Sequence, residues 1–112
     1  MKNMRDNRLE IGGVIITTEE QLSDCVVISF ENNCFRTERK DLIKILDNAI
    51  SVIGTRIKYQ MDGKDPSLFV VIDGYNSSCS RIKLVWKGET LFNKAYDRLT
   101  LEGLRSILSR WE

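Results

Sequence analysis

The sequence contains no histidine, a single proline and almost no net charge. Without histidine the chain lacks the commonest general base near neutral pH, which excludes Ser-His and Cys-His nucleophile pairs and nearly all catalytic zinc sites. Seventeen Lys and Arg against sixteen Asp and Glu leave a formal charge of +1, so no overall field favours nucleic acid or anionic lipid. Enzyme chemistry would have to rest on carboxylates, Lys, Tyr or Cys, and any basic surface has to be local.

The sequence also lacks a long apolar run and a pairable set of cysteines. Residues 1–8 are polar, and no later segment resembles a signal peptide or a membrane-spanning helix. The three cysteines are an odd number at unrelated spacings, as expected of reduced thiols. We therefore expect a cytoplasmic protein without metal or cofactor, with a flexible segment at 1–8 and one domain over 9–112, a usual length for a domain.

The first third of the chain has the pattern of strands. Residues 9–16 are predicted to form a strand interrupted by the Gly-Gly pair 12–13, where a bulge or a close backbone approach is tolerated. Residues 25–30 alternate between apolar and other side chains, as in a half-buried strand. The Asn-Asn pair at 32–33 predicts a tight turn, followed by a short strand over 34–36.

The apolar period changes from two to 3.6 after this short strand, which predicts an amphipathic helix. Thr37 is the expected N-cap and Gly54 the expected residue just after the C-cap. The apolar stripe of this helix consists of Leu42, Leu46, Ala49, Ile50 and Ile53.

The second half predicts four strands and one more helix. The strands are expected at 56–61, 68–72, 80–86 and 90–96, with turns over 62–66 and 87–89. Thr100 is the expected cap of the last helix, whose apolar positions are Leu101, Leu104, Leu108 and Trp111.

The predicted order is β-β-β-α-β-β-β-β-α, an α+β domain. Because each helix has one apolar stripe, we expect a mainly antiparallel sheet of about five to seven strands with both helices on one face. The hairpin and helix around 26–46 resemble those around 82–108, which raises the hypothesis of an internal duplication.

Two residues, Cys34 and Asp73, are candidates for a catalytic role. Cys34 lies near Arg36 and Arg39, and cations lower a thiol pKa, but a lone cysteine beside an aromatic residue is more often a buried apolar filler. Asp73 ends an apolar strand, where metal-binding carboxylates often lie, but a turn-forming role is the simpler interpretation. We therefore assign no catalytic, cofactor-binding or metal-binding residue.

Two groups of cations are candidate binding surfaces. The first clusters at the start of the first helix, where the helix dipole disfavours positive charge, and predicts an acidic partner: Arg36, Arg39, Lys40 and Lys44. The second is expected on one face of the sheet, beside Tyr59 or Tyr75: Arg56, Lys58, Arg81, Lys83, Lys87 and Lys94. Such a face could bind a nucleic-acid backbone, but Lys and Arg are also common on the solvated side of an antiparallel sheet, so both interpretations stay open.

Three classes of function follow. The first is a non-catalytic protein-interaction module, such as an inhibitor, an immunity-type protein or a regulatory protein, for example in a phage or mobile element. The second is single-stranded nucleic-acid binding: the second half resembles, in element order alone, single-stranded-DNA-binding coactivator and whirly domains. The third is an enzyme based on carboxylate or Cys chemistry. The first class is favoured because it requires none of the missing residues.

Overall fold

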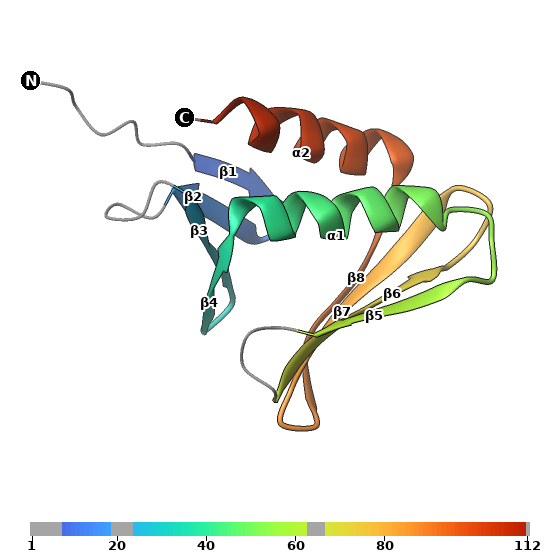
Figure 1. The fold of residues 1–112 in the computed structure, drawn as a ribbon, viewed down its shortest axis with the longest axis horizontal. Helices are drawn as coiled ribbons and strands as arrows, with labels where there is room; N and C mark the ends of the chain where they lie inside the picture. Colours follow the sequence, from blue (N-terminus) through green and yellow to red (C-terminus); the bar gives the residue numbers. More distant parts are fainter. Residues whose placement is uncertain (1–7, 19–23, 63–66, 112) are drawn as a thin grey trace, which may run out of the picture.

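The computed structural model describes residues 8–18, 24–62 and 67–111. The predicted flexible segment, apart from Arg8, and most of the turn predicted over 62–66 lie outside these ranges. The described chain is an α+β domain in which two helices lie side by side over two antiparallel sheets (Figure 1).

The first sheet is a meander of four short strands in chain order. Gly12 and Gly13 have φ of 54° and 84° and join two strands as a two-residue hairpin turn, so the predicted bulge is wrong and one predicted strand is in fact two. The following hairpin turns at residues 31–32, with φ of 54° at Glu31, one residue earlier than predicted. The strands are β1 (Arg8–Ile11), β2 (Val14–Thr18), β3 (Cys25–Phe30) and β4 (Asn33–Glu38).

The four strands predicted for the second half form a second sheet, a meander with longer strands. Lys87 and Gly88, with φ of 52° and 80°, form its last hairpin turn, and the register shifts between Leu84 and Val85. Its strands are β5 (Lys58–Asp62), β6 (Leu68–Gly74), β7 (Cys79–Trp86) and β8 (Glu89–Asp97).

The prediction of a single sheet is wrong, because the two meanders do not pair with each other. The helix α1 (Arg39–Ser51) runs between β4 and β5 and carries the chain about 20 Å before β5 begins. The strands β4 and β5 therefore each stay at the edge of their own sheet. Each half has the order ββββα, with α2 (Arg98–Arg110) closing the second half, so the element order repeats as the duplication hypothesis requires.

The caps of the helices differ from the predicted ones. The N-cap of α1 is Glu38, without a side-chain hydrogen bond, while the Thr37 hydroxyl lies 3.5 Å from the Glu38 carbonyl. The N-cap of α2 is Asp97, whose carboxylate accepts a 2.9 Å hydrogen bond from the backbone N–H of Thr100. At the other end of α1 the C-cap is Val52, and Gly54 follows two residues later with φ of 78°.

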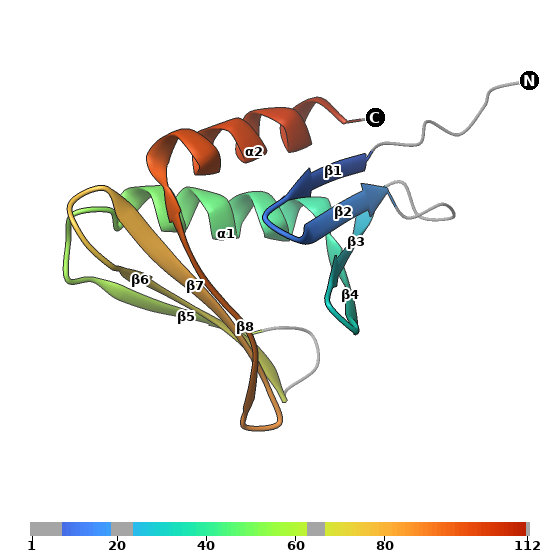
Figure 2. The same cartoon turned by 180° about the vertical axis from the view of Figure 1, so that it is seen from behind.

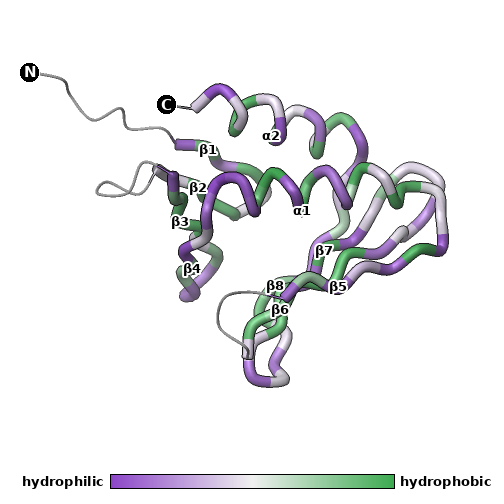
Figure 3. Tube along the Cα trace, in the orientation of Figure 1, coloured by the Kyte–Doolittle hydropathy of each residue, from purple (hydrophilic) through white to green (hydrophobic). Residues whose placement is uncertain are grey.

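The core lies where the helices meet the inner faces of both sheets, and its helical part matches the predicted stripes. Figure 2 shows α2 lying along α1 and over β1, and Figure 3 shows hydrophobic and hydrophilic residues alternating along the helices and strands. The buried apolar residues are Val14, Ile16, Val26, Leu42, Leu46, Ala49, Val52, Ile72, Leu101, Leu104 and Leu108.

Gly74 fixes the end of α1 against the second sheet. A Cβ atom at Gly74 would lie 2.2 Å from the carbonyl oxygen of Thr55 and 2.5 Å from that of Val52. Only glycine permits this approach of two backbone segments. Within the described ranges, no helix is long and apolar enough to cross a membrane.

Candidate functional site

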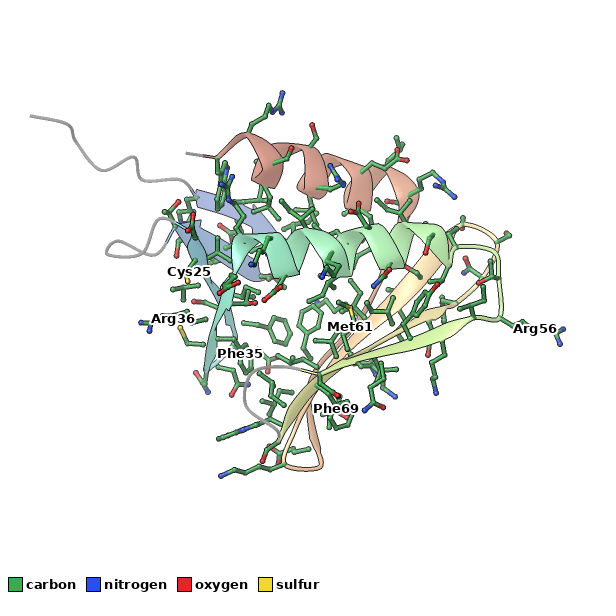
Figure 4. All side chains as sticks on the ribbon, in the orientation of Figure 1. Cys25, Phe35, Arg36, Arg56, Met61 and Phe69 are labelled. Carbon is green, nitrogen blue, oxygen red and sulfur yellow. The ribbon has the colours of Figure 1, made fainter. Side chains whose placement is uncertain are left out.

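An apolar groove opens between the edge strands β4 and β5, beneath α1. Its volume is about 550 Å³. In Figure 4, Met61 lies between α1 and β5, while Arg36 points away from β4 into solvent. The apolar lining consists of Ile28, Phe35, Ile45, Met61, Leu68, Val70 and Leu84, and the polar part of Cys25, Arg36, Thr37, Glu38, Asp41, Lys44 and Asp62.

Strand register explains why apolar side chains converge in the groove. Ile28 pairs with Phe35 in the first sheet, and Val70 pairs with both Met61 and Leu84 in the second. Directly opposed residues share a face of an antiparallel sheet, so each row presents its side chains together. The two rows belong to the inner faces of two different sheets and therefore meet across the groove.

Contacts between the sheets limit the groove on the side of β8. The rings of Phe30 and Phe92 meet edge to face, with centroids 5.1 Å apart. The Lys94 ammonium donates a 3.2 Å hydrogen bond to the Gly12 carbonyl and lies 5.1 Å from the centre of the Phe30 ring. These contacts tie β8 to the first sheet.

The predicted acidic-partner surface divides into two parts. Arg36 and Lys44 line the groove. The Arg39 guanidinium donates to the carbonyls of Leu108, at 2.9 Å, and Trp111 at the end of α2. The C-terminal end of α2 lies beside the start of α1. The charge of Arg39 is therefore unfavourable for the dipole of α1 but favourable for the dipole of α2.

Lys40, the fourth residue of this surface, pairs with Glu38 at 3.5 Å and is highly exposed. It lines a second cavity, of about 420 Å³, together with Arg39 and Asp24. The four cations therefore form no single surface, and only two of them belong to the groove.

Three of the six residues of the predicted basic sheet face lie together on one face of the second sheet. Cross-strand rows place Lys58 beside Asp73 and Arg81, and Lys83 beside Val71 and Asn93, all on the outer face of the second sheet. The Arg81 guanidinium lies 4.4 Å above the centre of the Tyr75 ring and donates to the Asn93 side chain at 2.7 Å.

The other three residues of this prediction lie elsewhere. Lys94 pairs with Ile82, on the inner face, and bridges to the first sheet. Lys87 belongs to a turn and covers the Trp86 ring at 4.8 Å. Arg56 precedes β5 and projects away from the molecule (Figure 4).

Cys34 and Asp73, the two candidate catalytic residues, have surroundings different from those predicted. Cys34 is exposed on β4, with its sulfur 3.7 Å from the Ser29 hydroxyl, so the prediction of a buried filler is wrong. Asp73 lies within β6 and forms no turn; Asn76 has that role, accepting from the backbone N–H of Ser78 and Cys79 at 2.9 and 2.8 Å. The two cavities are lined by neither Cys34 nor Asp73.

Three described groups have shifted pKa values, all outside the groove. The hydrogen bond to Asp47 raises the pKa of Arg105. Burial raises the pKa of Tyr96, on β8, to about 12. Hydrogen bonds from the side chain and backbone of Thr100 lower the pKa of Asp97. Among the described residues, no group of three His, Cys, Asp or Glu side chains is placed to hold a metal ion.

Sequence reasoning missed the groove because its residues look like ordinary core positions. Ile57, Tyr59 and Met61 alternate as in a covered strand, yet only Met61 lines the groove, while Ile57 and Tyr59 are 49% and 40% exposed. The local signal was a strand with one apolar side that follows α1 after a short connection.

Comparison with known proteins adds little to this geometry. No family profile matches the chain, and no curated protein sequence matches it. Among solved structures it is similar to a protein of unknown function from the DUF155 family of Prochlorococcus sp. NATL2A, with a TM-score of 0.47 and 9% sequence identity, over 93% of this chain and 96% of that chain. A likeness of this size supports no inference about function.

Proposed function

We propose that this chain is a small, non-catalytic protein-interaction module of the cytoplasm. It acts as an inhibitor, an immunity-type protein or a regulatory protein by binding a partner protein. The observation that supports the proposal is the apolar groove of about 550 Å³ between β4 and β5. Concave, mostly apolar surfaces with a few polar groups at the rim are typical of binding sites.

The partner enters the groove with an apolar segment. The floor offers aliphatic, aromatic and thioether side chains, and burying apolar atoms against them contributes about 25 cal/mol per Å². The rim carries both signs of charge, since Lys44, Asp41 and Asp62 all line the groove. A mixed rim selects the orientation of the partner more than it raises affinity.

A capture experiment with matched charge reversals tests this proposal. Tagged wild-type chain, Lys44→Glu and Lys40→Glu are used to capture proteins from the native cell, and the captured partner is then purified and titrated against each chain. Lys44 and Lys40 are exposed residues of the same helix, but only Lys44 lines the groove. We expect Lys44→Glu alone to weaken binding, and equal binding by all three chains would contradict the proposal.

A second candidate function is single-stranded nucleic-acid binding on the outer face of the second sheet. It is favoured by the cations Lys58, Arg81 and Lys83, which share that face, and by the exposed ring of Tyr75, on which a base can stack. Asp73, between Lys58 and Arg81 in the same row, opposes it. Titration of the chain with a single-stranded oligonucleotide tests this function. It requires an affinity that falls steeply with salt concentration and is lost in the variant Arg81→Glu/Lys83→Glu.

A further inference from the structure

The strand β5 has one strand neighbour among the described residues, and its other edge is open. The backbone N–H of Gly74 donates to the carbonyl of Ile57 at 3.3 Å, one position beyond the pair Lys58–Asp73. In an antiparallel pair, alternate residues point their backbone groups toward the neighbour. Tyr59 and Met61 therefore bond toward β6, while the backbone groups of Lys58, Gln60 and Asp62 face the open edge.

The side chains of β5 divide in the same way. Lys58, Gln60 and Asp62 lie on the outer face of the sheet, in rows with Asp73, Val71 and Phe69. Tyr59 and Met61 lie on the inner face, and Tyr59 is 40% exposed although it belongs to a strand. An open edge that exposes apolar side chains is a site of strand pairing with another chain.

The charges of this edge are complementary to themselves. If two copies of β5 lie antiparallel with Gln60 opposite Gln60, Lys58 of each copy is opposite Asp62 of the other. Tyr59 is then opposite Met61, so apolar residues meet on the inner face and opposite charges meet on the outer face. Among the described residues, neither Lys58 nor Asp62 forms an ion pair, and Lys58 lies opposite Asp73 in its own sheet.

We infer that β5 is a homodimer interface, in which two copies of the chain pair their β5 edges about a two-fold axis at Gln60. The pairing joins the two second sheets into one continuous sheet and covers both Tyr59 side chains. It is isologous, so each Lys58–Asp62 contact occurs twice. The edge of β4 is less suited, because Arg36 and Glu38 already have interactions within the chain.

This interface goes beyond the proposed function, although Met61 and Asp62 belong both to β5 and to the groove. Self-association is measured without any partner protein, so the failure of one proposal is distinguishable from the failure of the other. The interface is small, because β5 has five residues. Small interfaces give weak dimers, and we expect a Kd between about 1 μM and 1 mM.

A charge swap tests the interface in solution by sedimentation velocity over a range of concentrations. Lys58→Glu sets like charges opposite each other at two places and is expected to weaken dimerisation at least about tenfold. The double variant Lys58→Glu/Asp62→Lys restores the two opposite-charge contacts and is expected to dimerise within about threefold of wild type. Lys83→Glu, on the same face but away from the edge, is the control and should leave the Kd unchanged.

A second variant tests the register without changing charge. Gln60→Cys, in a Cys34→Ser background, sets two thiols opposite each other across the axis at a Cα separation of about 5.5 Å, which permits a disulfide. Rapid oxidation to a covalent dimer supports the inference. A wild-type chain that stays monomeric at about 1 mM, or a dimer indifferent to the charge swap, overturns it.

Discussion

The two halves of the molecule have the same order of elements and begin their helices in opposite ways. Both consist of a four-stranded meander and a 13-residue helix. The helix of the second half is capped by Asp97, the residue directly before it. The helix of the first half has no side-chain cap, and its first residue, Arg39, binds the end of the other helix.

This difference shows where each half obtains its stability. The second half closes its own helix through a local hydrogen bond. The first half depends on contacts with the second: α1 contacts β6 and β7 as well as its own β4, and it lies against α2 along its length. The repeated order of elements therefore does not make two independent units, and variants at the contacts between the halves should have the largest effects.

The largest effect is expected at Gly74, where α1 meets β6. Gly74→Ala brings a methyl group against two carbonyl oxygens, and we expect it to lower the free energy of unfolding by about 3 kcal/mol. Gly103→Ala, in open space within α2, is the matched control and should raise it by about 0.5–1 kcal/mol. Urea unfolding measures both. A small effect at Gly74 would mean that the end of α1 is not fixed against the sheet.

Arg39 provides the next test. Arg39→Met keeps the length of the side chain but removes its hydrogen bonds to Leu108 and Trp111, and we expect a loss of about 2 kcal/mol. Hydrogen exchange should show the loss at the end of α2, a helix in the other half. Lys40→Met, at the neighbouring exposed position, should change stability little. Equal effects of the two variants would contradict the proposed link between the helices.

The aromatic contact between the sheets should give a smaller effect. A double-mutant cycle with Phe30→Leu and Phe92→Leu is expected to show a coupling free energy of about 1 kcal/mol, since the two rings meet edge to face. Additive effects of the two substitutions would show that the sheets do not depend on each other through these rings.

The two helix starts give a direct comparison of the halves. Asp97→Ala should lower Tm by a few degrees, while Thr37→Ala should leave it nearly unchanged, because the Thr37 hydroxyl caps nothing. Because its pKa is lowered, the contribution of Asp97 is present above its unfolded pKa and is lost as the pH falls. Calorimetry at neutral and acidic pH checks both statements.

The smallest effect concerns high pH. Since burial raises the pKa of Tyr96 from 10.0 to about 12, the neutral phenol stabilises the folded chain below pH 10. This contribution should be lost as the pH rises from 10 to about 12. Tyr96→Phe should unfold with less dependence on pH in this range, and an unchanged dependence would mean that other groups cause it.

Most of the elements were predictable because they depend on near neighbours in the chain. The 3.6-residue period in α1 and α2, and the alternation in the strands, placed the helical core residues such as Leu42 and Leu104 correctly. The predicted caps were less successful. Thr37 and Thr100 are of a residue type that is preferred at N-caps. The N-cap of α2 is nevertheless Asp97, and the N-cap of α1 is Glu38, which forms no side-chain cap.

The sheets and the cations were not predictable in the same way. The Gly12-Gly13 pair permits both a bulge and a hairpin turn, and only the pairing of Leu9 with Ile16 decides between them. The separation into two sheets depends on where α1 carries the chain, which no local pattern specifies. The two groups of cations looked coherent along the sequence, yet three of the six on the predicted sheet face lie elsewhere.

The sequence by itself determined the α+β class, the ββββα order of the second half and the apolar faces of both helices, because periodicity and turn preferences act over a few residues. The tertiary structure decided which charges are structural and which line a groove. Arg39 meets its partner Leu108 across 69 residues, and Lys94 meets Gly12 across 82. Such partners are set by the packing of helices and sheets, since a side chain bonds to what is near it in space.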